Sequence, residues 1–233
     1  MAARVQEPSI SLANVEVDFN GARALSIPAL QLGQQSIAVI GANGSGKSSF
    51  ARLLNGLLKP NSGSVLVNGV DVVADSRAAV RQAGFIFANP DLQIVMPTVI
   101  EDVEFSLRES ALSKSARRAK AVEALERVGL ASLSQQPAQT LSSGQKQLLA
   151  IAAITVNQPA LIIADEPTAL LDAGNTKLIA QLLFAPVAPQ LVLVTHDMAL
   201  AAKCDVAVWF EGGKIAEVGS AAAVIASYVG FIE

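Results

Sequence analysis

The chain of 233 residues has little charge, one cysteine and one histidine. Only 16% of its residues are charged, against 52% that are hydrophobic, and its formal net charge is −3. This slightly acidic balance lacks the basic footprint with which nucleic-acid-binding proteins contact phosphates, although a local basic groove is still compatible with it. The large apolar fraction argues against disorder. The length predicts one large domain, or one domain with an inserted subdomain.

A single cysteine, Cys204, excludes an intramolecular disulfide and fits a reducing, cytosolic setting. We interpret it as a small buried side chain rather than a reactive thiol. The N-terminal residues lack the apolar core of a signal peptide. The longest apolar run extends from Leu148 to Val156, well short of the ~18–20 residues that span a bilayer. The sequence therefore predicts a soluble chain that serves a membrane only through a partner.

Short apolar runs that are typical of buried strands alternate with helical patterns along most of the chain. This alternation predicts an α/β fold with a mainly parallel sheet. Four runs are expected to form the central sheet: residues 36–40, 84–87, 161–164 and 191–194. Polar residues follow three of these runs directly. Because ligands of such sheets bind beyond the carboxyl ends of the strands, we expect these polar residues to meet.

Two regions follow other patterns. Apolar and polar residues alternate over 10–19 and 65–70, and Asn68-Gly69 is a strong hairpin signal, which predicts an antiparallel β edge subdomain. Residues 89–147 are helical in pattern and predict an inserted helical subdomain; residues 8–88 and 148–233 then form the β edge and the core. Within the helical part, residues 116–128 predict an amphipathic helix with a solvated charged face.

The C-terminal part predicts a second hairpin, with strands 206–210 and 214–218, followed by an Ala-rich helix from Ser220. Trp209 lies in the first of these strands. A lone tryptophan in a strand is usually a core or subunit-surface residue, and we prefer that interpretation to stacking on a ligand.

Residues 41–48 read Gly-Ala-Asn-Gly-Ser-Gly-Lys-Ser and match the phosphate-loop (Walker A) pattern G-x-x-x-x-G-K-[ST]. A buried-strand run precedes the motif, and Phe50, Leu53, Leu54, Leu57 and Leu58 follow at helical spacing. Glycines let backbone N–H groups turn towards an anion, and the helix N-terminus adds its dipole. The motif predicts a P-loop NTPase (RecA-like) core; the alternative is a glycine turn without a ligand.

Within this loop, Lys47 is expected to reach the β- and γ-phosphates of ATP, and Ser48 to bind Mg²⁺. The predicted nucleotide-binding residues of the loop are Gly41, Ala42, Asn43, Gly44, Ser45, Gly46, Lys47, Ser48 and Ser49.

The apolar run 161–164 is followed by two carboxylates, Asp165 and Glu166. Asp165 is expected to hold Mg²⁺, usually through water, and Glu166 to polarise the attacking water. The alternative is a carboxylate pair that caps the next helix. Two carboxylates beside a triphosphate repel it unless a cation is present, so we expect Mg²⁺ as a cofactor together with ATP.

The stretch Leu141-Ser142-Ser143-Gly144-Gln145 precedes these carboxylates, and Pro167-Thr168 and Asp172 follow them. In this order and spacing the motifs resemble those of the ATP-binding cassette (ABC) ATPases, whose hallmark is an LSGGQ-like signature just before the second acidic strand. The resemblance runs from about Ile10 to Gly219. The chain departs from the family at Ser143, which is usually glycine. Serine is small and common at helix starts, so binding is expected to survive.

The resemblance implies roles for further residues. Phe19 matches the aromatic residue that stacks on adenine, with a core phenylalanine on an edge strand as the alternative. Gln93 matches the Q-loop glutamine, which contacts Mg²⁺ and the water. Asp172 matches the D-loop, which crosses to the opposite subunit, and His196 matches the switch histidine near the γ-phosphate.

The resemblance also implies a dimer. In this family the signature, here Ser142, Ser143, Gly144 and Gln145, serves the γ-phosphate that a second chain holds. A complete site therefore exists only when two ATPase subunits, identical or paralogous, close around ATP. Hydrolysis to ADP and phosphate removes the bridging group, and the pair loosens.

Residues 89–103 read Asn-Pro-Asp-Leu-Gln-Ile-Val-Met-Pro-Thr-Val-Ile-Glu-Asp-Val. They are similar to the Q-loop region of the energy-coupling factor (ECF) importers' ATPases, with its N-P-x-x-Q…P-T-V…D-V pattern. Lys146-Gln147 also fits, whereas Leu148 stands where this family usually has arginine. ECF ATPases energise the uptake of vitamins or of cobalt and nickel ions. The end of the chain soon after the last hairpin favours the biotin-importer type.

This resemblance implies a peripheral protein on the cytoplasmic face of the plasma membrane, bound to an integral coupling subunit and a substrate-binding membrane subunit, and no nucleic acid. Val95, Met96, Val99 and Ile100 are expected to form an apolar surface that docks on membrane helices; packing within the helical subdomain is the alternative. Two other classes stay open. One is a soluble ABC ATPase of iron–sulfur assembly or nucleic-acid maintenance, and the other is a nucleotide-binding scaffold without turnover.

Overall fold

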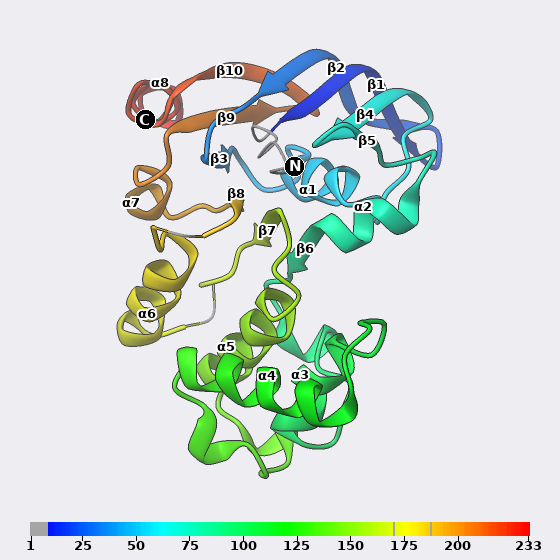
Figure 1. Cartoon of the computed structure of the whole chain (residues 1–233). Coiled ribbons are helices and arrows are strands. Elements are labelled where there is room, and N and C mark those ends of the chain that lie inside the picture. The colour runs from blue at the N-terminus through cyan, green and yellow to red at the C-terminus, as the bar shows by residue number, and fades with distance from the viewer. Residues whose placement is uncertain (1–8, 170, 187) are drawn as a thin grey trace. The chain divides into compact units, whose positions relative to one another are not determined.

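A computed structural model describes residues 9–169, 171–186 and 188–233 (Figure 1). Leu170, next to the expected D-loop, lies outside the described residues. The chain divides into two compact units. Within the described residues, unit 1 comprises residues 9–84, 160–165 and 189–233, and unit 2 comprises residues 85–159 and 166–188. The bounds of 89–147 for a helical subdomain stay a prediction.

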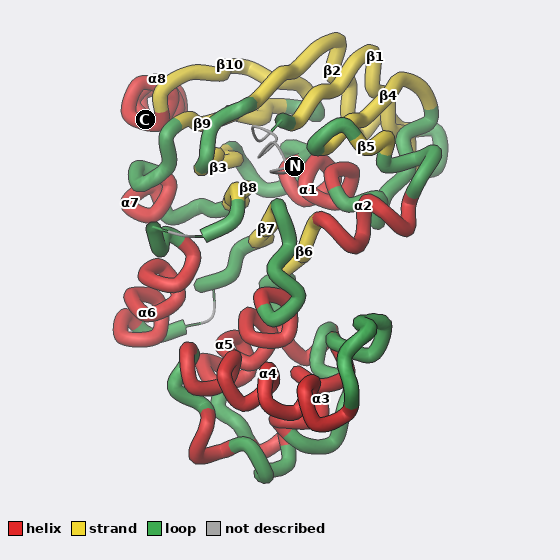
Figure 2. Tube along the Cα trace, viewed as in Figure 1, coloured by secondary structure: helices red, strands yellow, loops and turns green. Residues whose placement is uncertain are grey.

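Unit 1 contains an antiparallel sheet of four strands in the order β2-β1-β4-β5 (Figure 2). Its strands are β1 (Ile10–Phe19), β2 (Ala22–Leu32), β4 (Ser62–Val67) and β5 (Val70–Asp71). Asn68 and Gly69 join β4 to β5 with φ values of 48° and 77°. Positive φ at both central positions gives the hairpin turn its twist. The predicted antiparallel edge subdomain is confirmed.

A second, mainly parallel sheet has the strand order β10-β9-β3-β8-β7-β6. Its strands are β3 (Ser36–Ile40), β6 (Ala83–Ile86), β7 (Leu161–Asp165), β8 (Gln190–Val194), β9 (Val206–Glu211) and β10 (Lys214–Ser220). β3 pairs in parallel with β8 and with β9, and β8 pairs in parallel with β7, whereas β9 and β10 are antiparallel. The expected four strands are present, and the C-terminal hairpin, expected apart from them, extends the same sheet because β9 is buried beside β3.

The helices of unit 1 are α1 (Lys47–Leu54), α2 (Ser76–Gln82), α7 (Met198–Ala201) and α8 (Ala221–Ile232). α1 buries Phe50, Leu53 and Leu54 completely and ends there, because Gly56 turns the chain with a φ of 77°. Leu57 lies beyond this end and is 53% exposed. The prediction that the apolar face of the helix continues to Leu57 and Leu58 is therefore wrong.

The C-terminal side of unit 1 confirms two expectations about single residues. Trp209 is 8% exposed, and its ring packs on Tyr228 and Phe231 of α8 at centroid distances of 5.5 and 5.0 Å. It is therefore a packing residue. Cys204 is buried as well, with 6% of its surface exposed.

Unit 2 is helical. It contains α3 (Val99–Ser106), α4 (Lys114–Arg127), α5 (Ser143–Thr155) and α6 (Ala173–Leu183), with the 3-10 turns η1 (Pro90–Leu92), η2 (Ala131–Leu133) and η3 (Ala138–Thr140). α3, α4 and α5 pack on one another. α4 confirms the predicted amphipathic helix: Ala121, Ala124 and Leu125 are buried, although the apolar Val122 is 37% exposed. In the described part of the chain, no helix has the length and apolarity needed to cross a membrane.

Candidate functional site

The loop between β3 and α1 is built on glycines with positive φ. Gly41, Gly44 and Gly46 have φ values of 139°, 77° and 106°. A Cβ on Gly41 would lie 2.2 Å from the carbonyl oxygen of Phe210, and one on Gly46 would lie 2.6 Å from Cδ2 of Leu25. Only glycine fits these two positions, so the loop keeps its narrow path and its N–H groups remain available to an anion.

Lys47 begins α1 and turns its ammonium group over the loop. Its Nζ donates to the carbonyl oxygens of Gly41 and Ala42, both at 2.8 Å, and the residue is 7% exposed. Beside it, Oγ of Ser45 is buried and has no hydrogen-bond partner. A buried hydroxyl without a partner and a buried ammonium, in a cradle that a Cβ would fill, fit a phosphate group.

The remaining residues of the predicted loop line its outer side. Ala42, Asn43 and Gly44 are exposed, and Ser48 and Ser49 are half-buried in the first turn of α1. The loop therefore has exposed residues next to the hydroxyl groups of Ser48 and Ser49 at the start of α1.

The turn between β9 and β10 supports this loop from the other side, which sequence reasoning missed. Gly213 donates its N–H to the carbonyl of Ser45 at 3.0 Å and accepts the N–H of Ser26 at 2.8 Å. Its φ is 78°, and a Cβ there would lie 2.5 Å from the carbonyl oxygen of Ala24. The sequence predicts a hairpin turn between residues 206–210 and 214–218, but only the fold shows that this turn contacts the phosphate loop.

Asp165 ends β7 beside the start of α1. Oγ of Ser48 donates to its Oδ1 at 3.1 Å, and Asp165 is 6% exposed. Burial raises the pKa of this carboxyl, while the hydrogen bond from Ser48 and the positive charges of Arg52 and Lys47 oppose that rise. Neighbouring hydroxyl and carboxylate oxygens are the donor set that Mg²⁺ accepts, so this pair fits that ion.

Two more of the expected residues lie in unit 1. Phe19 ends β1 beside the turn at Asn20-Gly21 and is 48% exposed, so it is not a core side chain. His196 is exposed and follows β8 after the buried Thr195. Asp197 then caps α7 by accepting the backbone N–H groups of Ala199 and Leu200. The side chain of His196 is thereby placed at the carboxyl end of a central strand.

Glu166 is the first residue of unit 2 after β7 and has a φ of 52°. A left-handed backbone is costly for a residue other than glycine, by about 1–3 kcal/mol, and such strain clusters at functional sites. The half-buried side chain is followed by the buried Pro167. The neighbours of Glu166 in the sequence identify it as a candidate, but they carry no signal for this backbone conformation.

Both the oxygen and the nitrogen of the Gln93 side-chain amide form hydrogen bonds with the backbone next to β6. Its Nε2 donates to the carbonyl of Phe85 at 2.9 Å, and its Oε1 accepts the N–H of Phe87 at 2.8 Å. In this conformation Gln93 fastens the loop after β6. An amide oxygen has two lone pairs, so the hydrogen bond from Phe87 leaves one of them on Oε1 for a further partner.

The signature motif forms the start of α5. Oγ of Ser142 accepts the N–H of Gln145 at 3.3 Å, and Oε1 of Gln145 accepts the N–H of Ser142 at 2.9 Å, which is a capping box. Ser143, the departure from the family pattern, is the first residue of the helix. Serine is accommodated there without disturbing the cap.

The expected D-loop residue lies close to the signature within unit 2. Asp172 caps α6: its Oδ1 accepts the N–H of Asn175 at 2.9 Å and its Oδ2 accepts the side-chain Nδ2 at 2.8 Å. These hydrogen bonds lower the pKa of Asp172. A Cβ on Gly144 would lie 2.5 Å from the side chain of Asn175. The side chain of Asn175 thus lies close to Gly144 of the signature and also forms a hydrogen bond with Asp172.

The expected apolar surface near Gln93 needs a correction. Val99 and Ile100 are 0% and 1% exposed, because they begin α3 and face the core of unit 2. Val95 is 62% exposed, as expected, and Leu92, which was not expected in this surface, is 71% exposed. The exposed apolar residues therefore belong to the loop before α3, and we call residues 89–97 the loop segment.

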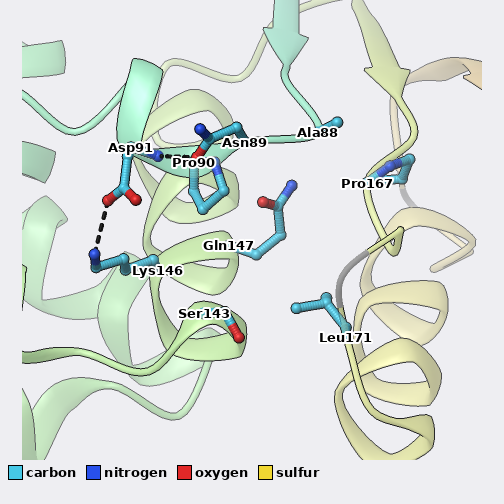
Figure 3. A pocket seen from close by; sticks show the side chains of 9 residues that line it. All are labelled: Ala88, Asn89, Pro90, Asp91, Ser143, Lys146, Gln147, Pro167 and Leu171. Carbon is cyan, nitrogen blue, oxygen red and sulfur yellow. Dashed lines mark hydrogen bonds and ion pairs between the residues drawn. The ribbon is translucent and has the colours of Figure 1, made fainter.

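A cavity of about 160 Å³ lies in unit 2 beside this loop segment (Figure 3). Asp91, Ser143, Lys146, Gln147, Pro167 and Leu171 are among the residues that line it. Ser143 and Gln147 come from the first turns of α5 and Asp91 comes from the loop segment, so the cavity adjoins the signature.

The ABC transporter family matches residues 30–169, more than half of the chain. The chain belongs to this family. It is an ATP-binding ATPase whose activity is coupled to transport. The predicted P-loop NTPase fold is confirmed.

Three curated relatives have specific names. The biotin transport ATP-binding protein BioM of Rhodobacter capsulatus is 38% identical over 95% of this chain and 94% of its own length. The nickel import ATP-binding protein NikO of the same organism is 35% identical over 94% and 92%. The energy-coupling factor transporter ATP-binding protein EcfA1 of Symbiobacterium thermophilum is 40% identical over 82% and 68%. The resemblance to ECF ATPases is confirmed.

Solved structures agree. The cbiO1 protein of Clostridium perfringens, described as part of the ABC transporter complex cbiONQ, superposes with a TM-score of 0.83 at 29% identity, covering 94% of this chain and 92% of that chain. The ATP-binding cassette MJ0796, solved as a dimer in a post-hydrolysis state with ADP and phosphate, gives a TM-score of 0.79 at 27% identity, covering 91% and 98%.

Proposed function

We propose that this ABC ATPase drives an importer of the ECF type, working as a nucleotide-sandwich dimer on membrane partners at the cytoplasmic face of the plasma membrane. The observation that carries the proposal is the similarity to relatives named for import over nearly the whole chain. The exposed side chains of Leu92 and Val95 in the loop segment support the docking part of it. Exposed apolar residues on a loop that its own unit holds by hydrogen bonds are suited to docking on a partner.

We propose biotin as the imported solute and a transition-metal ion as the competing one. Relatives named for biotin transport match 95% and 94% of this chain at 38% identity, slightly above the relative named for nickel import. Selectivity belongs to the membrane subunits, so the solute must be tested on the assembled transporter.

At the nucleotide, Lys47 and the loop glycines hold the β- and γ-phosphates, and Phe19 stacks on adenine. Ser48 and Asp165 would hold Mg²⁺, with Oε1 of Gln93 as a further ligand. Bound Mg²⁺ supplies neutralisation of phosphate charge. The short distance between Ser48 and Asp165 supports this arrangement.

Hydrolysis itself is assigned to two side chains. Glu166 orients and polarises the attacking water. The left-handed backbone at this residue sets the direction in which its side chain leaves the main chain. His196 lies near the γ-phosphate and stabilises the charge that develops there. Each acts on ATP that the phosphate loop of the same chain has bound.

The second half of each site comes from the partner ATPase, identical or paralogous. Ser142, Ser143, Gly144 and Gln145 present the start of α5 to the γ-phosphate across the dimer, and Asp172 lies beside them at the start of α6. The capping box takes up the N–H groups of Ser142 and Gln145, and the dipole of the helix start still attracts an anion, so ATP joins the two chains and hydrolysis releases them.

A capture experiment tests the docking part of the proposal. The tagged chain, expressed with its chromosomal neighbours and extracted in detergent, is expected to bring down integral membrane proteins. Val95→Glu should abolish this capture, because a charge then replaces a 62% exposed apolar side chain of the loop segment. Val80→Glu is the matched control, since Val80 is 58% exposed on α2.

Recovery of only soluble scaffold proteins would contradict the importer and favour the soluble ABC class. Loss of capture in both valine variants would show that Val95 has no special role. Uptake of labelled biotin and of nickel by vesicles that carry the complex then separates the two solutes.

A further inference from the structure

Two neighbouring residues of α5 hold the chain that follows β6. Nζ of Lys146 donates to Oδ1 of Asp91 at 2.7 Å, and Nε2 of Gln147 donates to the carbonyl of Phe87 at 3.1 Å. Figure 3 shows the ion pair at the side of the cavity, with Gln147 in the next position of the helix. The side chain of Lys146 is 19% exposed and Gln147 is 1% exposed. The side chain of Asp91 is 61% exposed, so the ion pair is shielded from water only on the side of Lys146, and the hydrogen bond of the buried Gln147 is the better protected of the two contacts.

The same helix carries the signature one turn earlier. The backbone N–H of Lys146 donates to the carbonyl of Ser142 at 2.9 Å, so the cap residue and the lysine are joined directly. Ser143, Lys146 and Gln147 are also among the residues that line the cavity. The contacts with Asp91 and Phe87 thus join the first turns of α5 to the chain that follows β6.

The loop segment is held firmly at its other end. Oδ1 of Asp102 accepts the N–H groups of Val95 and Met96 at 2.9 and 3.0 Å, and Asp102 is 4% exposed in α3. Because this end is fixed, we expect a displacement of the loop segment to be passed on to the residues that bond to it, including Lys146, and not to be lost in a flexible chain. Asp91 is next in sequence to Leu92, the most exposed of the segment's apolar residues.

We propose that Lys146 and Asp91 are positioning residues that set the place of the signature motif relative to the loop segment. A partner pressing on Leu92 then moves Asp91, Lys146 and the cap at Ser142 together. The proposal rests on the proposed nucleotide-sandwich dimer, in which this cap serves the nucleotide of the other chain.

Charge exchange tests it on the whole chain. In the background Glu166→Gln, which is expected to keep ATP bound, the variants Lys146→Glu, Asp91→Lys and the double exchange are compared for MgATP-driven dimerisation by analytical ultracentrifugation. Each single variant should weaken dimerisation about fivefold, the size expected of one partly exposed ion pair. The double exchange should return to within about twofold of the parent, since the pair is restored with reversed charges.

Three controls separate an effect on dimerisation from effects on nucleotide binding, folding or net charge. Binding of a fluorescent ATP analogue by the monomer should be unchanged in all variants, because the phosphate loop lies in unit 1 and these residues lie in unit 2. The thermal midpoint reports on folding. Lys120→Glu makes the same charge change at an exposed position of α4 and should dimerise like the parent.

Single variants that dimerise like the parent would overturn the inference. So would a double exchange as weak as the singles, because Lys146 would then act on the nucleotide directly or through folding. If the parent itself does not dimerise with MgATP, the nucleotide sandwich of the proposed function fails, which is a separate outcome.

Discussion

The side chains of Ser48 and Asp165 meet although 117 residues separate them along the chain: Oγ of Ser48 donates to Oδ1 of Asp165 at 3.1 Å. The first residue stands in the opening turn of α1 and the second at the carboxyl end of β7. Parallel strands end at the same edge of a sheet, and the helix that follows β3 starts at that edge. A hydroxyl and a carboxylate from distant parts of the sequence are thereby brought within hydrogen-bonding distance.

Replacing Lys47 by alanine should weaken ATP binding by about 10–100-fold, since a charge-assisted bond to phosphate contributes roughly 1.5–3 kcal/mol. The change also removes the ammonium that donates to Gly41 and Ala42. Isothermal titration with ATP measures the effect. Lys59→Ala, at an exposed position beyond α1, is the control and should bind like the parent.

Replacing Glu166 by glutamine should leave ATP binding intact and reduce turnover by about 10²–10³-fold, the usual effect of removing one positioned group. The amide keeps the size of the side chain but cannot accept a proton from water. Phosphate release under single-turnover conditions measures the rate. Near-normal turnover would show that Glu166 does not orient the water.

A mixture of two inactive chains tests whether the signature acts across the dimer. Ser142→Arg blocks the cap of α5, and Lys47→Ala blocks the phosphate loop. A heterodimer of the two has one site in which both halves are intact, so mixing should restore at most one working site per pair. If the signature acted within its own chain, no ratio of the two proteins would hydrolyse ATP.

Gly213 and Gly212 form a matched pair for testing support of the phosphate loop. Gly212→Ala meets open space and should cost about 1 kcal/mol of unfolding free energy from its positive φ alone. Gly213→Ala also drives a Cβ towards the carbonyl of Ala24 and should cost about 1–3 kcal/mol more.

Urea unfolding measures these differences, and nucleotide titration shows their functional part. Only Gly213→Ala should raise the ATP dissociation constant, because Gly213 bonds to Ser45 in the loop. Equal ATP affinity in the two variants would mean that the turn contributes stability alone. Slower amide exchange of residues 211–214 on addition of MgATP is the test on the unmodified chain.

Cys204 should react slowly with thiol reagents. Burial, and secondarily the negative charge of Asp205, raises the pKa of its thiol to about 12. At pH 8 a chromogenic disulfide should label the native chain at least ~100-fold more slowly than the chain in guanidinium, where the thiol has its ordinary pKa of about 8.5. Equal rates would place the thiol at the surface.

The same pKa predicts a pH dependence of stability. The folded chain holds this proton more tightly than the unfolded chain does, so the contribution of Cys204 is complete below pH ~8.5 and is lost as the pH rises towards 12. Cys204→Ala should therefore show a smaller loss of unfolding free energy between pH 8 and 10 in urea titrations.

Local sequence determined a large part of this protein. The phosphate-loop pattern, the carboxylates after a buried run and the capped signature each depend on residues that are neighbours in the chain, and hydrogen bonding and periodicity act over that same range. The hairpin at Asn68-Gly69 and the packing role of Trp209 followed for the same reason. Motif order and spacing were enough to identify the family.

Only the tertiary structure decided what depends on contacts between distant segments. Burial of Val99 and Ile100, and exposure of Leu92, follow from how α3 packs in unit 2, which periodicity over a short loop cannot reveal. The support of Ser45 by Gly213 and the ion pair of Lys146 with Asp91 join residues 168 and 55 positions apart. Such contacts form because the folded backbone brings the partners within hydrogen-bonding distance, and no local pattern encodes that distance.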